Sequence, residues 1–184
     1  MAHKENQRIA LTRRLLQEGL LRLLANNKLD DISVTALCKE AGINRATFYN
    51  HYTAPSALLY EMEQTLIAEL KQINKPAKSL EQILDQLERS CIHLKENTAL
   101  IQILVKFHAD DDLEDIVKTL ARYYDEYRLD SSGTHFDPDT MRLVSVYLYA
   151  GCYHLIREWV VSDIDKTPRE IAELLVSLVS KKYL

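Results

Sequence analysis

A short segment near the N-terminus gathers side chains that can contact nucleic acid. Between Asn44 and Tyr52 the chain offers a guanidinium, hydroxyls, an amide and an imidazole. Such groups bond phosphates and base edges, and an arginine at the start of a helix suits guanine O6 and N7. Phe48 and Tyr52 are four residues apart and are expected to face inward. The side chains left at the front or on the outer side are Arg45, Ala46, Thr47, Tyr49, Asn50 and His51.

Two short helices broken by one glycine would position these side chains. Ser33 is a good N-cap for the first helix, and Asn44 can cap the second by accepting a backbone N–H. Gly42 can adopt the left-handed conformation that ends a helix. One apolar face of the first helix is formed by Val34, Leu37, Cys38 and Ala41. The arrangement is typical of a helix-turn-helix and makes DNA the leading partner, an ordinary helix corner being the alternative.

The residues around this motif resemble the tetracycline-repressor (TetR) family of transcription regulators. The resemblance covers about residues 8–62, a third of the chain, and consists of one long helix, the segment 33–52 and the run 53–60. Ala41-Gly42-Ile43-Asn44 corresponds to the family's A-G-V-S, Thr47 and Tyr49 to its T-x-Y, Tyr52 to the next aromatic and Leu58 to the closing leucine. The sequence departs from the family at Pro55, where a lysine usually touches DNA phosphate.

The resemblance implies an all-α fold with an N-terminal helix-turn-helix DNA-binding head on a helical ligand-binding and dimerisation body. We expect residues 1–54 to form the head and 55–184 the body, with helix 55–73 as connector. The expected activity is that of a homodimeric repressor released from double-stranded operator DNA by a small-molecule effector. The residues expected to contact DNA are Ser33, Thr35, Asn44, Arg45, Ala46, Thr47, Tyr49, Asn50 and His51.

The proline at position 55 keeps a second function class open. Proline suits the first turn of a helix, so the fold survives, but one phosphate contact is missing. A coregulator or small-molecule sensor that acts through a protein partner, with little or no DNA binding, is therefore the alternative. An enzyme is disfavoured, because we find no nucleophile elbow, phosphate-cradling glycine loop or paired carboxylates. No catalytic residue, cofactor or metal ligand is predicted, and the acidic run 110–115 is interpreted as a favourable helix start.

Composition and charge agree with a helical regulator. The chain has 184 residues, 47% of them apolar, and only four Gly and four Pro, which favours helices over sheets. It has neither a signal peptide nor a run of about 18 apolar residues, so we expect a cytoplasmic protein without a membrane partner. The net charge is −4, yet residues 1–60 hold eight Lys/Arg against five Asp/Glu. A mildly basic head on an acidic body suits phosphate binding at one end.

Apolar periodicity and breakers predict about nine helices in all. Besides the two of the helix-turn-helix, they cover residues 5–26, 55–73, 79–95, 97–108, 112–129, 138–161 and 168–182. The inward face of the first is expected to hold Ile9, Leu16, Leu20 and Leu23. The last two are expected to pack against their copies in a homodimer through Val144, Leu148, Cys152, Leu155 and Trp159 and through Ile171, Leu174, Leu175, Leu178 and Val179.

Aromatic residues concentrate in the C-terminal half of the chain. Tyrosine offers an apolar wall with a hydroxyl, so some of these residues could line an effector cavity near residues 90–127 and 143–159, although core and dimer packing is the plainer interpretation. The effector would be small and mostly apolar or aromatic, since no basic cluster there favours a highly anionic one. The expected effector contacts are Tyr123, Tyr127, Tyr147 and His154.

Overall fold

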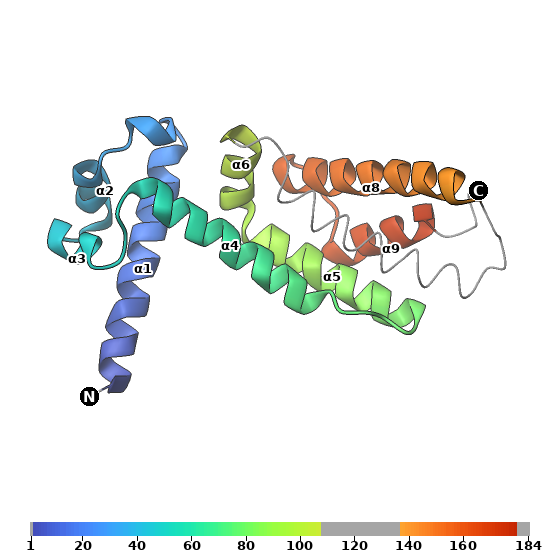
Figure 1. Ribbon diagram of the computed structural model, residues 1–184, viewed down its shortest axis with the longest axis horizontal. Helices are drawn as coiled ribbons and strands as arrows, with labels where there is room; N and C mark the ends of the chain where they lie inside the picture. Colours follow the sequence, from blue (N-terminus) through green and yellow to red (C-terminus); the bar gives the residue numbers. More distant parts are fainter. Residues whose placement is uncertain (1, 108–136, 180–184) are drawn as a thin grey trace. The chain divides into compact units, whose positions relative to one another are not determined.

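The chain folds entirely into helices over the residues that the structure describes. These residues, 2–107 and 137–179 of the computed structural model, contain eight α-helices, one 3₁₀ turn and no strand (Figure 1). The predicted all-α class is therefore confirmed. The helix expected at 112–129 lies outside the described residues, as do Tyr123 and Tyr127.

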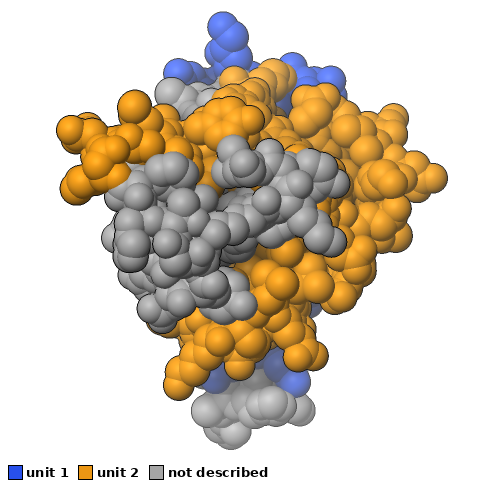
Figure 2. Space-filling model, turned by 90° about the vertical axis from the view of Figure 1, so that its right-hand side faces the viewer, with its two compact units in different colours: residues 1–66 blue, residues 67–184 orange. Residues whose placement is uncertain are grey.

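Two compact units divide the chain, Met1–Leu66 and Ile67–Leu184, coloured separately in Figure 2. The boundary falls inside one helix, α4, which spans Pro55–Ile73. Pro55 occupies the first position of α4, where its missing N–H costs no hydrogen bond. In the described ranges, no helix is long and apolar enough to cross a membrane.

Unit 1 is built on α1 (Ala2–Leu24), followed by the 3₁₀ turn η1 (Leu29–Asp31), α2 (Val34–Ala41), α3 (Arg45–Tyr49) and the first part of α4. Its core consists of side chains with no exposed surface, namely Leu16, Leu20, Leu24, Leu37, Phe48 and Leu58. The predicted helices agree with these elements, but the inward face of α1 differs at both ends.

The predicted apolar face of α1 was wrong by one residue at the C-terminal end of the helix and extended too far toward the N-terminal end. Leu24 is fully buried, whereas Leu23 is only half-buried. Ile9 is 37% exposed, because residues 6–11 are all exposed and only the later turns of α1 meet the core.

A glycine allows α1 and α2 to approach closely. A Cβ added at Gly19 would lie 3.2 Å from the Cβ of Ala41 and 3.3 Å from its backbone nitrogen. A larger residue at Gly19 would therefore require Ala41 and its backbone to shift by a few tenths of an ångström. The contact is reinforced by an ion pair in which Arg22 Nε donates to Glu40 Oε1 at 2.6 Å.

Unit 2 contains the end of α4 together with α5 (Leu80–Glu96), α6 (Thr98–Phe107), α8 (Pro138–Val161) and α9 (Pro168–Val179). Ser79 caps α5 by accepting from the backbone N–H of Gln82, and Asp137 caps α8 in the same manner. These boundaries lie within a few residues of the predicted ones, because capping side chains and prolines mark the helix starts.

Trp159 joins three elements of unit 2. Its side chain is 1% exposed and its indole N–H donates to the carbonyl of Lys166 at 3.0 Å, in the link between α8 and α9. The ammonium of Lys95, on α5, lies 4.8 Å from the ring centroid. Arg169 of α9 adds an ion pair with Glu88 of α5 at 2.8 Å.

The predicted homodimer stripes lie partly in the core of the single chain, which corrects the sequence interpretation. Leu148, Trp159, Ile171 and Leu175 are buried in unit 2, because α5 and α6 cover these faces of α8 and α9. The outward face of α8 is instead apolar at neighbouring positions. Its large exposed side chains are Leu143, Val146 and Tyr147, at 71%, 57% and 74%, and Leu174 and Leu178 are exposed on α9.

Candidate nucleic-acid interface

The turn between α2 and α3 is fixed by local hydrogen bonds. The Ser33 hydroxyl accepts from the N–H of Ala36 at 3.1 Å and starts α2. Gly42 ends it with φ 66° and ψ 26°, a left-handed conformation that side chains disfavour. The N–H of Ile43 then donates to the carbonyl of Cys38 at 2.9 Å, as in a Schellman motif. The predicted caps and turn are confirmed.

The second helix is short, and two contacts hold it. Asn44 Oδ1 accepts from the N–H of Thr47 at 3.0 Å, which satisfies a donor at the start of α3. Phe48 is fully buried and Tyr52 is 5% exposed, as their spacing predicted. The ring of Phe48 packs edge-on against Tyr49 at 5.6 Å between centroids. A helix of five residues therefore takes its orientation from the core beneath it.

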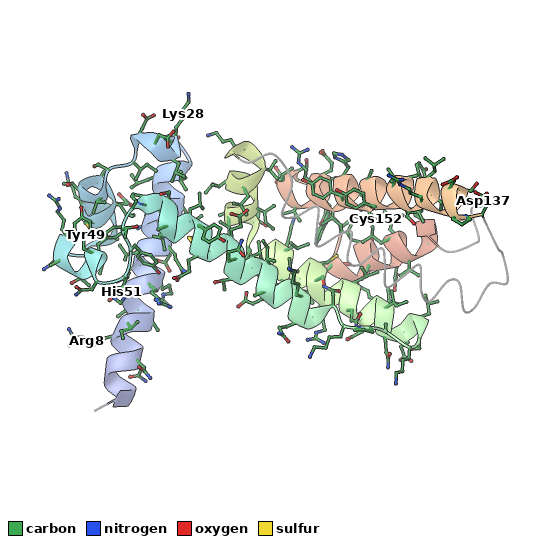
Figure 3. All side chains as sticks on the ribbon, in the orientation of Figure 1. Arg8, Lys28, Tyr49, His51, Asp137 and Cys152 are labelled. Carbon is green, nitrogen blue, oxygen red and sulfur yellow. The ribbon has the colours of Figure 1, made fainter. Side chains whose placement is uncertain are left out.

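None of the nine residues predicted to contact DNA is buried. Thr47 and His51 are half-buried, and the exposed ones are Ser33, Thr35, Asn44, Arg45, Ala46, Tyr49 and Asn50. All but His51, which follows the C-cap of α3, belong to α2, α3 or their caps, and Figure 3 labels Tyr49 and His51 at this edge of unit 1. The guanidinium carbon of Arg45 lies 6.0 Å from the Tyr49 ring centroid, so the two side chains lie together on one face. The outward set can thus meet an extended polar partner.

A part-buried hydrogen bond supports the end of this surface. The Tyr52 hydroxyl donates to Glu61 Oε1 on α4 at 2.8 Å, and Arg13 of α1 lies 3.8 Å from the same oxygen. Burial, then the hydrogen bond to Glu61 and its charge, raise the pKa of Tyr52 to about 12. Sequence reasoning missed Glu61 and Arg13, because neither belongs to the motif and only the packing of α1 and α4 brings them together.

The other predicted site residues do not gather into a pocket that the structure describes. Tyr147 and His154 both lie on the exposed face of α8, and the rings of His154 and Tyr153 meet edge-on at 5.1 Å. Within the described ranges, no group of three or more His, Cys, Asp or Glu side chains could hold a metal ion. Burial raises the pKa of Cys91 to about 12 and that of Cys152 to about 11, which makes both thiols poor nucleophiles at neutral pH.

Solved structures with the same fold include three transcriptional regulators. The dihydroxyacetone kinase operon activator DhaS shares 20% identity over 91% of this chain and 93% of its own, with a TM-score of 0.64. A TetR transcriptional regulator from Streptococcus agalactiae 2603V shares 19% over 98% and 100%, with a TM-score of 0.65. A TetR-family regulator from Bordetella parapertussis 12822 shares 13% over 93% and 95%, with a TM-score of 0.66.

The C-terminal part of the chain matches a known protein family. No curated protein matches the sequence. The TetR-type family described as "Transcriptional regulator C-terminal region" matches residues 81–181, more than half of the chain. The N-terminal helix-turn-helix, the helical body and this match agree, and the chain belongs to the TetR family of transcriptional regulators.

Proposed function

We propose that this regulator binds operator DNA through α3 and its flanks and is a repressor released by a small-molecule effector. TetR-family proteins are transcription factors and not enzymes, and the family implies operator binding and dimerisation. The observation that carries the proposal is the exposed polar face of α3 on a turn fixed by Gly42 and Asn44. We assign the DNA contact to the nine residues named above.

Within this surface, two kinds of contact have different roles. Arg45 and Thr47 lie in the first turn of α3, where side chains reach base edges, so they read sequence. Tyr49 and His51 lie at the end of α3 and just after it, where they contact phosphate and fix the position of the head.

The experiment that tests this proposal selects bound fragments from random or genomic DNA and measures the affinity of variants for the selected site. Replacement of Arg45 or Thr47 by Ala should weaken binding by about 1–3 kcal/mol and relax specificity at one base pair per half-site. Replacement of Tyr49 or His51 should weaken binding evenly across sequences. Lys28→Ala, an exposed cation beyond the C-terminal end of α1, is the matched control. Unchanged binding in all four variants would remove α3 from the interface.

The assembly that fits a two-fold operator is a homodimer, and we assign its contact to α8 and α9. Leu143 and Tyr147 are four residues apart on one face of α8, and Leu174 and Leu178 repeat this spacing on α9. Large apolar side chains at such exposure indicate a surface that a partner covers. Packing of the two helices against their copies gives a four-helix seam with two-fold symmetry.

The effector binds in the body, in this proposal, and shifts the population toward a form that does not fit the operator. Residues 1–54 serve as the DNA-binding domain and 55–184 as the effector-binding and dimerisation domain, with helix 55–73 as connector. The position of the unit boundary inside α4 supports a shared helix. The exposure of Tyr147 and His154 favours the dimer surface over an internal cavity for these two side chains.

Calorimetry with and without operator tests the effector, because a ligand that releases DNA must itself bind more weakly when DNA is present, by the same factor. Equal affinity in both titrations excludes that ligand as an inducer. The alternative, a sensor that acts through a protein partner, is motivated by Pro55, which leaves the start of α4 without a cation. A wild-type protein that binds no DNA in the selection would favour this alternative.

A further inference from the structure

The N-terminal turns of α1 extend beyond the core of unit 1. Residues 6–11 are all exposed, and Leu16 is the first fully buried side chain of the helix. With a rise of about 1.5 Å per residue, Arg8 lies about 12 Å beyond Leu16 along the helix axis. Helical backbone at this distance from the core leaves its side chains accessible to a partner.

Arg8 differs from the other arginines of α1 in having no acidic partner among the described residues. Arg13 pairs with Glu61 at 3.8 Å, Arg14 with Glu18 at 3.4 Å and Arg22 with Glu40 at 2.6 Å. These three charges are already balanced by carboxylates. Among the described side chains of α1, Arg8 is thus the exposed arginine whose charge no carboxylate balances.

The helical period places Arg8 on the side of α1 that faces α2. Gly19 follows Arg8 by 11 residues and Arg22 follows it by 14, which are about three and four turns at 3.6 residues each. Both later residues meet α2, Gly19 at Ala41 and Arg22 at Glu40. Arg8 thus points to the side of the helix-turn-helix, and Figure 3 shows it at the same edge of unit 1 as Tyr49 and His51.

The contact that supports the end of α3 also involves α1. Tyr52, which follows His51, bonds Glu61, and Glu61 in turn lies beside Arg13. Arg8 is a further five residues along α1, about 7.5 Å toward its N-terminus.

We propose that Arg8 is an additional phosphate-binding residue, which flanks the helix-turn-helix contact and supplies a cation that position 55 lacks. The inference rests on the proposed DNA-binding function and extends it to a residue outside the motif. The occupant is a backbone phosphate of the duplex, because a phosphate accepts a single guanidinium, whereas a base edge is read by groups positioned within the groove. The contact is independent of sequence and positions the head without adding specificity.

The test compares the salt dependence of DNA binding in four proteins: wild type, Arg8→Ala, Arg8→Lys and Lys28→Ala. The probe is a mixed-sequence duplex of about 30 base pairs, long enough for two half-sites and their flanks. Loss of one phosphate contact reduces the slope of log K against log salt by about 0.9 per protomer. The advantage of wild type over Arg8→Ala should therefore fall about 3-fold per protomer between about 50 and 200 mM salt.

The conservative variant Arg8→Lys and the control Lys28→Ala separate charge from structure. Arg8→Lys should keep the wild-type slope, because a phosphate accepts either cation, and Lys28→Ala should keep it because Lys28 lies beyond the opposite end of α1. A slope for Arg8→Ala equal to that of wild type overturns the inference and leaves the proposed function intact. Absence of DNA binding in the wild-type protein overturns the proposed function and this inference together.

Discussion

Replacement of Gly42 tests whether the turn before α3 has one permitted backbone conformation. A Cβ at this position would meet no atom within 4 Å, so Gly42→Ala adds no steric contact. The cost comes from φ 66° alone, and a left-handed alanine costs about 1–2 kcal/mol. Replacing Gly by Ala lowers the conformational entropy of the unfolded chain, which stabilises a protein where alanine can adopt the native backbone conformation. At Gly42 alanine is strained in the native conformation, so this gain does not offset the cost. We expect unit 1 to lose about 1 kcal/mol or slightly more.

Asparagine gives the matched control, because its side chain tolerates the left-handed region. If unit 1, Met1–Leu66, unfolds as one domain, about 1 kcal/mol corresponds to a shift of about 4–8 °C in its Tm. Thermal unfolding followed by circular dichroism should therefore rank wild type, Gly42→Asn and Gly42→Ala in falling order. Affinity for a selected operator should follow the same order, since α3 is oriented by this turn. Equal melting of Gly42→Ala and wild type, or of the two variants, would refute the argument.

Two further substitutions test the Tyr52–Glu61 contact and the proposed homodimer. The pKa of Tyr52 is raised from 10 to about 12 in the folded protein. Its contribution to the free energy of unfolding is therefore complete below pH 10 and is lost as the pH rises toward 12. Tyr52→Phe should remove this alkaline loss of stability in a pH series of unfolding curves. Leu143→Glu, which puts a charge on the outward face of α8, should convert a dimer to a 21.3 kDa monomer in sedimentation at micromolar concentration, whereas Arg142→Glu beside it should not.

The head could be predicted almost completely from local sequence. Ser33 and Gly42 determine where α2 begins and ends, and Asn44 determines where α3 begins, through hydrogen bonds that span at most five residues. Phe48 and Tyr52 were assigned inward on spacing alone and are buried. Such features depend on neighbours in the chain, which a single sequence displays directly.

The features that sequence reasoning missed depend on distant parts of the chain. The Tyr52–Glu61 bond joins the segment after α3 to α4, and Arg13 of α1 lies beside the same carboxylate. The outward face of α8 was misassigned for a similar reason. Both sides of this helix are apolar, with Leu148 on one and Tyr147 on the other, so its period alone does not say which side α5 and α6 cover.

Ion pairs within unit 1 reduce the number of cations that can contact DNA phosphate, and the salt dependence of DNA binding follows that number. Of its described Lys and Arg residues, Arg13, Arg14 and Arg22 are paired with carboxylates. Arg8, Lys28, Lys39 and Arg45 have no acidic partner in the described part of the chain.

The number of phosphate contacts follows from these four residues. Lys28 lies beyond the far end of α1, and Arg45 is assigned to a base. Two cations per protomer, Arg8 and Lys39, then meet phosphate, which predicts a slope of log K against log salt of about −3.6 for a dimer. A slope steeper than about −8 would mean that more cations meet phosphate than these four described residues of each protomer supply.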